Sequence, residues 1–345
     1  MGFMKENTLE LLIQHAIEYA EGSVVFAFQG GEPMLAGMDF FKKAIELQAF
    51  YGKQKPGLRI ENTLQTNGIL INEEWADFFK EHHFLIGISL DGPRKLHDEA
   101  RVDTLGYPTF EKVMNAISIL KRKQVDFNIL TVVKEETTKK AGALYQFYKR
   151  NHFPYVQLIP CMDETFRQQG ERSTYAVQPE HYGTFLCQFF DLWYADFAKG
   201  ELMDIRMFSN LAQMAAGFPP EECGMCGKCQ CYFVVEGDGS VYPCDFYCME
   251  QYRLGTVQTA FSELKNSGAA TEFERQSEHP AEECLKCKYY SLCRGGCRRF
   301  RESFTDGILG VNYYCQAYQI FLDYAWERIV KLGKTIIDPA FRKNL

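Results

Sequence analysis

The distribution of cysteine along the chain is the feature that most restricts what this protein can be. Eleven of its 13 cysteines fall within residues 223–315, and only Cys161 and Cys187 lie outside that stretch. The N-terminus has no basic segment followed by an apolar core, so no secretory signal is expected. A reducing compartment disfavours a disulfide framework, and clustered cysteines in such a compartment indicate metal or iron–sulfur ligation.

The spacing of these cysteines predicts two four-thiolate sites. Thiolates two to five residues apart can converge on one metal centre. Structural zinc sites stay open as an alternative, because Cys-x2-Cys pairs serve zinc equally well. The strongest series is Cys284, Cys287, Cys293 and Cys297, with Cys315 further on, and the second is Cys223 and Cys229 with Cys244. The cysteines that need not be ligands are Cys226, Cys231 and Cys248, with Cys161 and Cys187 expected to be ordinary buried thiols.

The first half of the chain alternates strand-like and helix-like segments. Repeated βα units imply a parallel sheet, either open and doubly wound or curved into a barrel. Glycine-bearing turns follow the strands, at the sheet edge where α/β folds build their sites. The predicted strands are 24–28, 59–65, 84–90, 125–133 and 155–160, and the predicted helices are 4–19, 38–51, 73–82, 110–123, 141–149, 181–199, 202–217 and 311–331. A hairpin is predicted over 232–243.

Length and charge exclude some classes of function. The 345 residues suggest about two domains, and a hydrophobic content of 46% allows a substantial core. A formal net charge of -7 argues against binding of nucleic-acid backbones. No apolar run of about 18 residues occurs, so no membrane partner is expected and the default location is the cytoplasm.

Five segments, in order, resemble motifs of the anaerobic sulfatase-maturating enzymes, a family of radical S-adenosylmethionine (SAM) enzymes. They are FAFQGGEP at 26–33, LQTNG at 64–68, SLDGP at 89–93, VYPCDFY at 241–247 and NYYC at 312–315. The cysteine-rich region resembles a SPASM domain, which carries two auxiliary [4Fe-4S] clusters. The resemblance implies a partial (β/α)6 barrel over residues 1–218, N-terminally truncated here. A SPASM domain with a C-terminal helix would follow over 219–345.

The resemblance also implies an activity. The family oxidises a Cys or Ser side chain of a sulfatase to Cα-formylglycine, using a radical made by cleaving SAM, and passes an electron out through the auxiliary clusters. The implied partners are an unfolded sulfatase, or a peptide with a C/S-x-P-x-R core, and an electron donor such as flavodoxin or ferredoxin. Two alternatives stay open: another SPASM enzyme that modifies a ribosomal peptide, and a non-catalytic metal-binding scaffold or electron carrier.

Site residues follow from the same resemblance. Asp245 matches the proposed general base, and Ser89 and Arg101 match residues that hold the SAM carboxylate. Gly30 and Gly31 would meet the SAM amino group, although the residues alone fit a tight turn equally well. The remaining positions assigned to the SAM cleft are Gln29, Glu32, Gln65, Thr66, Asn67 and Asp91.

The family pattern divides the cysteines between two auxiliary clusters. Four thiolates saturate a [4Fe-4S] cube, so such clusters should carry electrons and not bind substrate. Cys231 could replace Cys229 as a ligand. The pattern assigns Cys223, Cys229, Cys244 and Cys297 to auxiliary cluster I, and Cys284, Cys287, Cys293 and Cys315 to auxiliary cluster II.

One departure from the family pattern is decisive. The Cx3Cx2C motif that holds the SAM-binding cluster should follow a first barrel strand, but no cysteine precedes Cys161. We interpret the sequence as a fragment or a truncated gene product, with the third cluster expected only in a full-length form. The strand at 24–28 should then be an exposed edge, and the chain as given is expected not to cleave SAM.

Overall fold

The computed structural model describes residues 2–162, 175–201, 203–302 and 309–337. The chain divides into two compact units. The first comprises residues 1–89, 111–127 and 230–276, and the second comprises 90–110, 128–229 and 277–345. Six strands follow one another in chain order, β1 to β6, in one sheet. The pairs β1–β2, β2–β3, β4–β5 and β5–β6 are parallel. The predicted α/β class with a parallel sheet is therefore confirmed.

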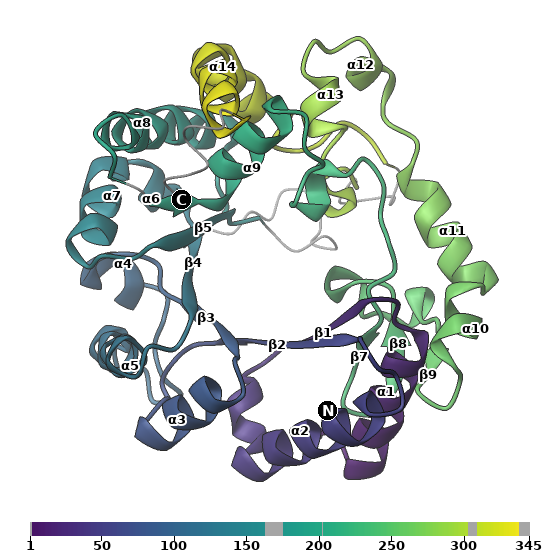
Figure 1. Cartoon of the computed structure of the whole chain (residues 1–345). Helices are drawn as coiled ribbons and strands as arrows, with labels where there is room; N and C mark the ends of the chain where they lie inside the picture. The colour runs from purple at the N-terminus through teal and green to yellow at the C-terminus, as the bar shows by residue number, and fades with distance from the viewer. Residues whose placement is uncertain (1, 163–174, 202, 303–308, 338–345) are drawn as a thin grey trace. The chain divides into compact units, whose positions relative to one another are not determined.

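The first unit holds the first three strands of this sheet. They are β1 (Ser23–Phe28), β2 (Arg59–Thr66) and β3 (Leu85–Ser89), with Ser23 opposite Arg59 and Thr63 opposite Leu85. The helices of this unit include α1 (Glu6–Tyr19), α2 (Met38–Gly52), α3 (Glu73–Glu81) and α5 (Phe110–Lys123). Figure 1 shows α2 and α3 on the same face of β1 and β2. Within the described residues β1 ends the strand order, as predicted, and its Val25 is exposed.

Helix α1 joins two parts of the first unit. Its apolar face packs against β1 and α2, and also against a small antiparallel sheet from the cysteine-rich region. That sheet contains β7 (Val234–Val235), β8 (Ser240–Tyr242) and β9 (Gly255–Thr256), followed by α10 (Phe261–Lys265) and α11 (Gly268–Ser277). The predicted hairpin is confirmed. Sequence patterns did not indicate β9, α10 or α11, because these elements span only 2, 5 and 10 residues.

The second unit holds the rest of the parallel sheet. Its strands are β4 (Phe127–Val133), β5 (Tyr155–Pro160) and β6 (Asp204–Ile205), and its helices include α4 (Arg94–Asp98), α6 (Glu135–Thr138), α7 (Ala141–Arg150), α8 (Pro179–Phe197) and α9 (Arg206–Ala215). The prediction of a helix over 202–217 was wrong at its start. Asp204 pairs with Tyr155, and its backbone N–H donates to Pro154, so the chain forms β6 before α9 begins.

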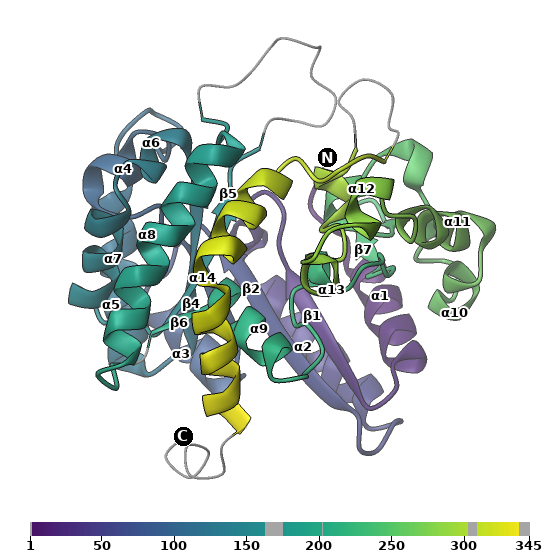
Figure 2. The same ribbon diagram turned by 90° about the horizontal axis from the view of Figure 1, so that it is seen from above.

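Helix α14 (Cys315–Ile337) packs beside α8 in the second unit, as Figure 2 shows. The helix predicted over 311–331 instead begins at Cys315, just after a turn in which the Asn312 side chain accepts a hydrogen bond from the backbone N–H of Tyr314. The aromatic run of α8 was predicted to be core. Phe185, Phe189 and Phe190 are indeed fully buried.

The contact between α8 and α14 requires a glycine. A Cβ on Gly183 would lie 3.0 Å from the Cα and carbonyl oxygen of Ala317. Gly183→Ala is therefore expected to destabilise the protein by about 1–3 kcal/mol, measured by urea or thermal unfolding. Gly142, within α7, is the matched control, because its added Cβ would meet nothing within 4 Å. Gly142→Ala should be neutral or stabilising, and equal effects of the two changes would contradict the packing argument.

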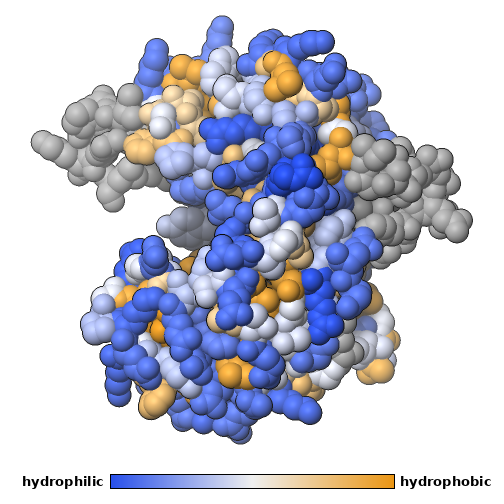
Figure 3. Space-filling model, turned by 90° about the vertical axis from the view of Figure 1, so that its right-hand side faces the viewer, coloured by the Kyte–Doolittle hydropathy of each residue, from blue (hydrophilic) through white to orange (hydrophobic). Residues whose placement is uncertain are grey.

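Among the described residues, no helix is long and apolar enough to cross a membrane. Figure 3 shows one face of the molecule, where hydrophilic side chains predominate and apolar ones form small scattered groups.

Candidate functional site

Glu32 ties the turn after β1 to the turn after β2. Its carboxylate accepts hydrogen bonds from the Thr66 hydroxyl at 2.8 Å, the Asn67 backbone N–H at 2.8 Å and the Met34 N–H at 3.1 Å. The Thr66 hydroxyl in turn accepts from the N–H of Gly68. Two loops at the carboxyl ends of neighbouring strands are thereby held in one fixed arrangement.

The glycine pair after β1 is required by backbone conformation. Gly30 and Gly31 have φ angles of 95° and 57°, in the region that side-chain-bearing residues rarely adopt. An added Cβ on either would meet nothing within 4 Å. Packing inside the protein therefore does not demand these glycines, and the backbone is left open to close approach by a ligand.

Gln29 and Asp245 meet in the first unit although they are 216 residues apart. The Gln29 Nε2 donates to Asp245 Oδ2 at 3.1 Å, and the Cys244 thiol lies 3.2 Å from Oδ1. Asp245 begins a short 3-10 turn, η3 (Asp245–Tyr247), whose buried Tyr247 packs edge-on against Phe273. The turn fixes the backbone while the Asp245 carboxylate stays solvent-exposed. An accessible, well-oriented carboxylate can act as a base.

Asp91 holds Arg101 in the second unit. The buried carboxylate accepts from Arg101 Nε at 2.9 Å and Nη2 at 3.1 Å, and from the backbone N–H of Val132 at 3.0 Å. Lys134 adds a buried positive charge 3.6 Å away. Both carboxylate oxygens of Asp91 are thus engaged in hydrogen bonds within the protein. These bonds orient Arg101, whose side chain stays partly exposed.

His97 supports the same loop from inside. Its Nδ1 accepts from the Asp91 backbone N–H, so the neutral ring carries its proton on Nε2 and donates to Thr109 Oγ1 at 3.0 Å. The Thr109 hydroxyl then donates to the carbonyl oxygen of Arg101 at 2.8 Å. This chain of hydrogen bonds fixes the backbone at both ends of the segment from Asp91 to Arg101.

The environment of His97 predicts a pH dependence. Complete burial lowers the pKa of His97 from 6.5 to about 4. The unfolded chain therefore binds more protons between these values, so this histidine's contribution to stability is complete above pH 6.5 and is lost as the pH falls toward 4. Hydrogen exchange at the His97 Cε1, followed by mass spectrometry, should give a pKa below 5; a value near 6.5 would contradict this environment.

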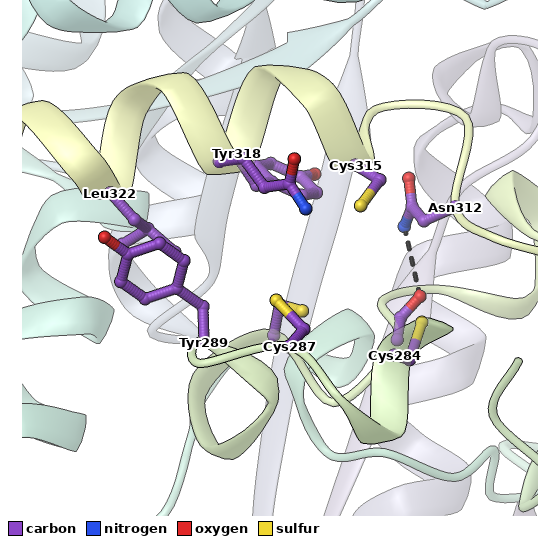
Figure 4. Close-up of a pocket in the computed structure, with 10 residues that line it drawn as sticks. Cys284, Cys287, Tyr289, Asn312, Cys315, Tyr318 and Leu322 are labelled. Carbon is purple, nitrogen blue, oxygen red and sulfur yellow. Dashed lines mark hydrogen bonds between the residues drawn. The ribbon is translucent and has the colours of Figure 1, made fainter. Parts of the chain in front are cut away.

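Four of the predicted cluster ligands surround one cavity in the second unit. Cys284 lies in α12 (Glu282–Leu285), Cys287 follows it, Cys293 ends α13 (Tyr290–Cys293), and Cys315 begins α14. The cavity encloses about 320 Å³, part of it open to solvent. Figure 4 shows Cys287 and Cys315 on opposite sides of it. Its other lining residues are Tyr289, Gly295, Asn312, Tyr318, Gln319 and Leu322.

A left-handed turn after Cys293 shapes this cavity. Arg294, Gly295 and Gly296 have φ angles of 47°, 88° and 76°. A Cβ on Gly296 would lie 2.0 Å from the amide nitrogen of Asn312, which donates to the Gly295 carbonyl at 3.3 Å. The glycine pair therefore lets the loop after Cys293 reach the start of α14.

The thiols of this cavity interact electrostatically. Burial, together with the neighbouring Cys284, Cys293 and Cys287, raises the pKa of Cys315 to about 11. Four adjacent thiolates are unfavourable without a cation, so metal binding is what would stabilise their ionised form. Within the described part of the chain, no three His, Cys, Asp or Glu side chains are arranged to hold a single metal ion. Thiols spread around a cavity suit a cluster with one thiolate on each iron.

Three of the four ligands predicted for the other cluster also lie together in the second unit. Burial raises the pKa of Cys297 to about 11, and the charges of Cys223 and Cys229 raise it as well. The Cys229 N–H donates to Ser277 Oγ at 2.7 Å. The fourth predicted ligand, Cys244, belongs to the first unit, where it precedes Asp245.

Four of the five remaining cysteines have thiols that contact backbone carbonyl groups, and the fifth, Cys161, is only partly buried. Each of the four thiols lies 3.7–4.0 Å from such an oxygen: Cys226 from Glu222, Cys248 from Cys244, Cys231 from Ala270 and Cys187 from Ile320. Cys231 lies in the first unit, with its backbone N–H bonded to Glu274.

The structure brings together several residues assigned from sequence. Gln29 contacts Asp245, Glu32 contacts Thr66 and Asn67, and Asp91 contacts Arg101. Gln65 is exposed in β2, and Ser89 ends β3. The assignment of these residues to SAM stays a prediction. Sequence reasoning missed His97 and Tyr318, because nothing in their spacing separates them from ordinary core residues, and it gave Asn312 no role although this residue begins the NYYC motif.

Comparison with protein families matches two parts of the chain. Residues 1–148 match the radical SAM superfamily, and residues 223–288 match the SPASM iron-sulfur cluster-binding domain. Domains of these two kinds imply SAM and [4Fe-4S] clusters as cofactors.

Curated proteins and solved structures extend the likeness to nearly the whole chain. A cysteine-type anaerobic sulfatase-maturating enzyme of Clostridium perfringens is 43% identical over 336 residues, covering 97% of this chain and 90% of that protein. A serine-type enzyme of Bacteroides thetaiotaomicron is 32% identical over 359 residues, covering 99% and 86%. A solved structure described as native anSMEcpe with bound AdoMet and Cp18Cys peptide superposes with a TM-score of 0.93, at 43% identity, covering 96% of this chain and 92% of that one.

Proposed function

This chain belongs to the anaerobic sulfatase-maturating enzymes, and we propose that it oxidises a cysteine or serine side chain of a sulfatase to Cα-formylglycine. The observation that carries the proposal is the hydrogen bond from Gln29 to Asp245. It orients an exposed carboxylate on the residue that directly follows Cys244, a predicted cluster ligand.

The reaction removes two protons and two electrons from the target side chain. A carbon radical, which SAM would supply when bound and cleaved, accepts one hydrogen atom, a proton with an electron, from the Cβ. A base takes the thiol or hydroxyl proton, and the second electron leaves. The product from serine is the aldehyde itself; the thioaldehyde from cysteine needs water to give the aldehyde and hydrogen sulfide.

Asp245 suits the role of base. Its turn is anchored by buried Tyr247, and the Gln29 amide orients one carboxylate oxygen from another segment. A base must lie within hydrogen-bond reach of the proton that it removes, and orientation from two sides favours that geometry.

Residues at the strand ends would hold SAM. The open backbone at Gly30 and Gly31 allows close approach to the amino group, and Arg101, orientated by Asp91, can bind the carboxylate bidentately. Residues 1–148 contain no cysteine. They therefore do not fit the cluster that this superfamily uses to cleave SAM.

The cysteine-rich region would carry the departing electron. The cavity lined by Cys284, Cys287, Cys293 and Cys315 fits a [4Fe-4S] cube with four protein ligands. A cube saturated in this way passes electrons without binding substrate.

The proposed partners are an unfolded sulfatase, or its peptide, and a small electron donor such as flavodoxin or ferredoxin. We propose the cytoplasm as the place of reaction, since the clusters require a reducing environment. The higher identity to a cysteine-type relative than to a serine-type one, 43% against 32%, favours cysteine as the target.

The test is turnover of a defined peptide. The protein as the cell makes it, reconstituted with iron and sulfide without oxygen, is given SAM, a low-potential reductant and a peptide with a C-x-P-x-R core. We expect an aldehyde at the cysteine, trapped by a hydrazide and located by tandem mass spectrometry. The serine peptide and a scrambled peptide are the matched controls.

The proposal would be contradicted if no SAM cleavage products formed and no aldehyde appeared on either the cysteine peptide or the serine peptide. A different modification of the peptide would favour the other SPASM enzymes that modify ribosomal peptides.

A further inference from the structure

Tyr318 stands out among the residues around the four-cysteine cavity. It lies three residues after Cys315 on α14, so both side chains lie on the same face of the helix. Long helical side chains lean toward the N-terminus of their helix, which directs Tyr318 toward the turn that carries Cys315. Figure 4 shows Tyr318 beside Cys315 and across the cavity from Cys287.

The Tyr318 side chain lines the same cavity as the Cys284, Cys287, Cys293 and Cys315 thiols. A phenolic hydroxyl keeps its proton at neutral pH and can donate a hydrogen bond into that cavity.

A second tyrosine at the cavity differs in one respect. The Tyr289 hydroxyl donates to Asp323 Oδ1 at 2.5 Å, so its proton is already engaged. Among the described residues, the structure shows no hydrogen-bond partner for the Tyr318 hydroxyl. Of these two tyrosines, Tyr318 has the proton that is free for a cluster sulfur.

We propose that the Tyr318 hydroxyl donates a hydrogen bond to a sulfur of the bound clusters and thereby raises the reduction potential of the cluster that accepts it. The inference rests on the proposed function, because it requires that the cysteines hold [4Fe-4S] clusters. Hydrogen bonds to cluster sulfurs stabilise the reduced form, which carries one more negative charge. Tyr318 is thus a tuning residue of the electron path and contacts no substrate.

The test compares reduction potentials in the reconstituted chain. Tyr318→Phe should lower the ratio of reduced to oxidised cluster, at a fixed potential, by about threefold to tenfold for one of the two clusters. Tyr289→Phe, the matched control, should leave both potentials unchanged. The readout is an electron paramagnetic resonance redox titration, with iron and sulfide content measured for each protein.

A second substitution guards against simple loss of packing. Tyr318→3-fluorotyrosine keeps the ring and the hydroxyl but makes the hydroxyl a stronger donor, so the affected potential should move upward. Unchanged potentials in both Tyr318 variants, with normal cluster content, would overturn the inference alone. A wild-type chain that takes up no iron and sulfide would overturn the proposed function as well.

Discussion

Asp245→Asn is expected to slow formylglycine formation by about 10²- to 10⁴-fold, the usual contribution of a positioned base. Asparagine keeps the size of the side chain and one oxygen that can accept from Gln29, but it cannot take the substrate proton. Cleavage of SAM without product should continue, because the hydrogen bond from Gln29, a predicted SAM residue, can be kept. Both rates can be followed in one assay, as 5′-deoxyadenosine and peptide aldehyde.

Asp238 provides the matched control for Asp245. It lies in the hairpin turn of the same unit, where its carboxylate accepts from the Ser240 N–H at 2.9 Å. Asparagine serves equally well in such a turn, so Asp238→Asn should leave turnover within about twofold. Equal losses in the two variants would indicate a folding effect, and full activity of Asp245→Asn would remove Asp245 from the mechanism.

Cys315→Ala is the second change with a large expected effect. It removes one of the four thiols around the cavity, and the cluster proposed to bind there should no longer assemble. The iron content should therefore fall by about four atoms per chain. Without this cluster the electron has no route out, and aldehyde formation should cease. Iron analysis and the peptide assay on the same preparation measure both effects.

Cys187→Ala is the control for the loss of a thiol. Cys187 is partly buried in α8, its thiol faces the Ile320 carbonyl, and burial raises its pKa to about 11. It should keep the full iron content and activity. If Cys315→Ala also kept its iron, the assignment of the four ligands would be wrong.

The parallel sheet was predictable because its strands are short apolar runs that end at glycine-bearing turns. The burial of β4 alternates along Phe127–Val133, and the turn after β1 contains Gly30 and Gly31 with positive φ angles. Local sequence determines such features. Spacing also grouped Cys284, Cys287 and Cys293, which lie within ten residues of one another, whereas the assignment of Cys315 to the same site came from the family resemblance.

The features that could not be predicted from the sequence depend on contacts between segments that are distant along the chain. Gln29 was assigned to the SAM cleft on its position alone, and only the fold brings it to Asp245. A buried histidine such as His97 has no distinguishing pattern in sequence, because its role depends on the partners at its two ring nitrogens. The start of α9 was mispredicted for the same reason, since Asp204 and Ile205 are drawn into the sheet by β5.

The measurement that tests the central claim most directly is the iron, acid-labile sulfide and zinc content of the 345-residue chain after reconstitution without oxygen. The claim is that the cysteine-rich region carries the electron out through two clusters, each with four protein thiolates. The account predicts about eight iron and about eight sulfide per chain. About two zinc per chain with no sulfide would contradict it, because zinc bound by four thiolates is structural and carries no electron.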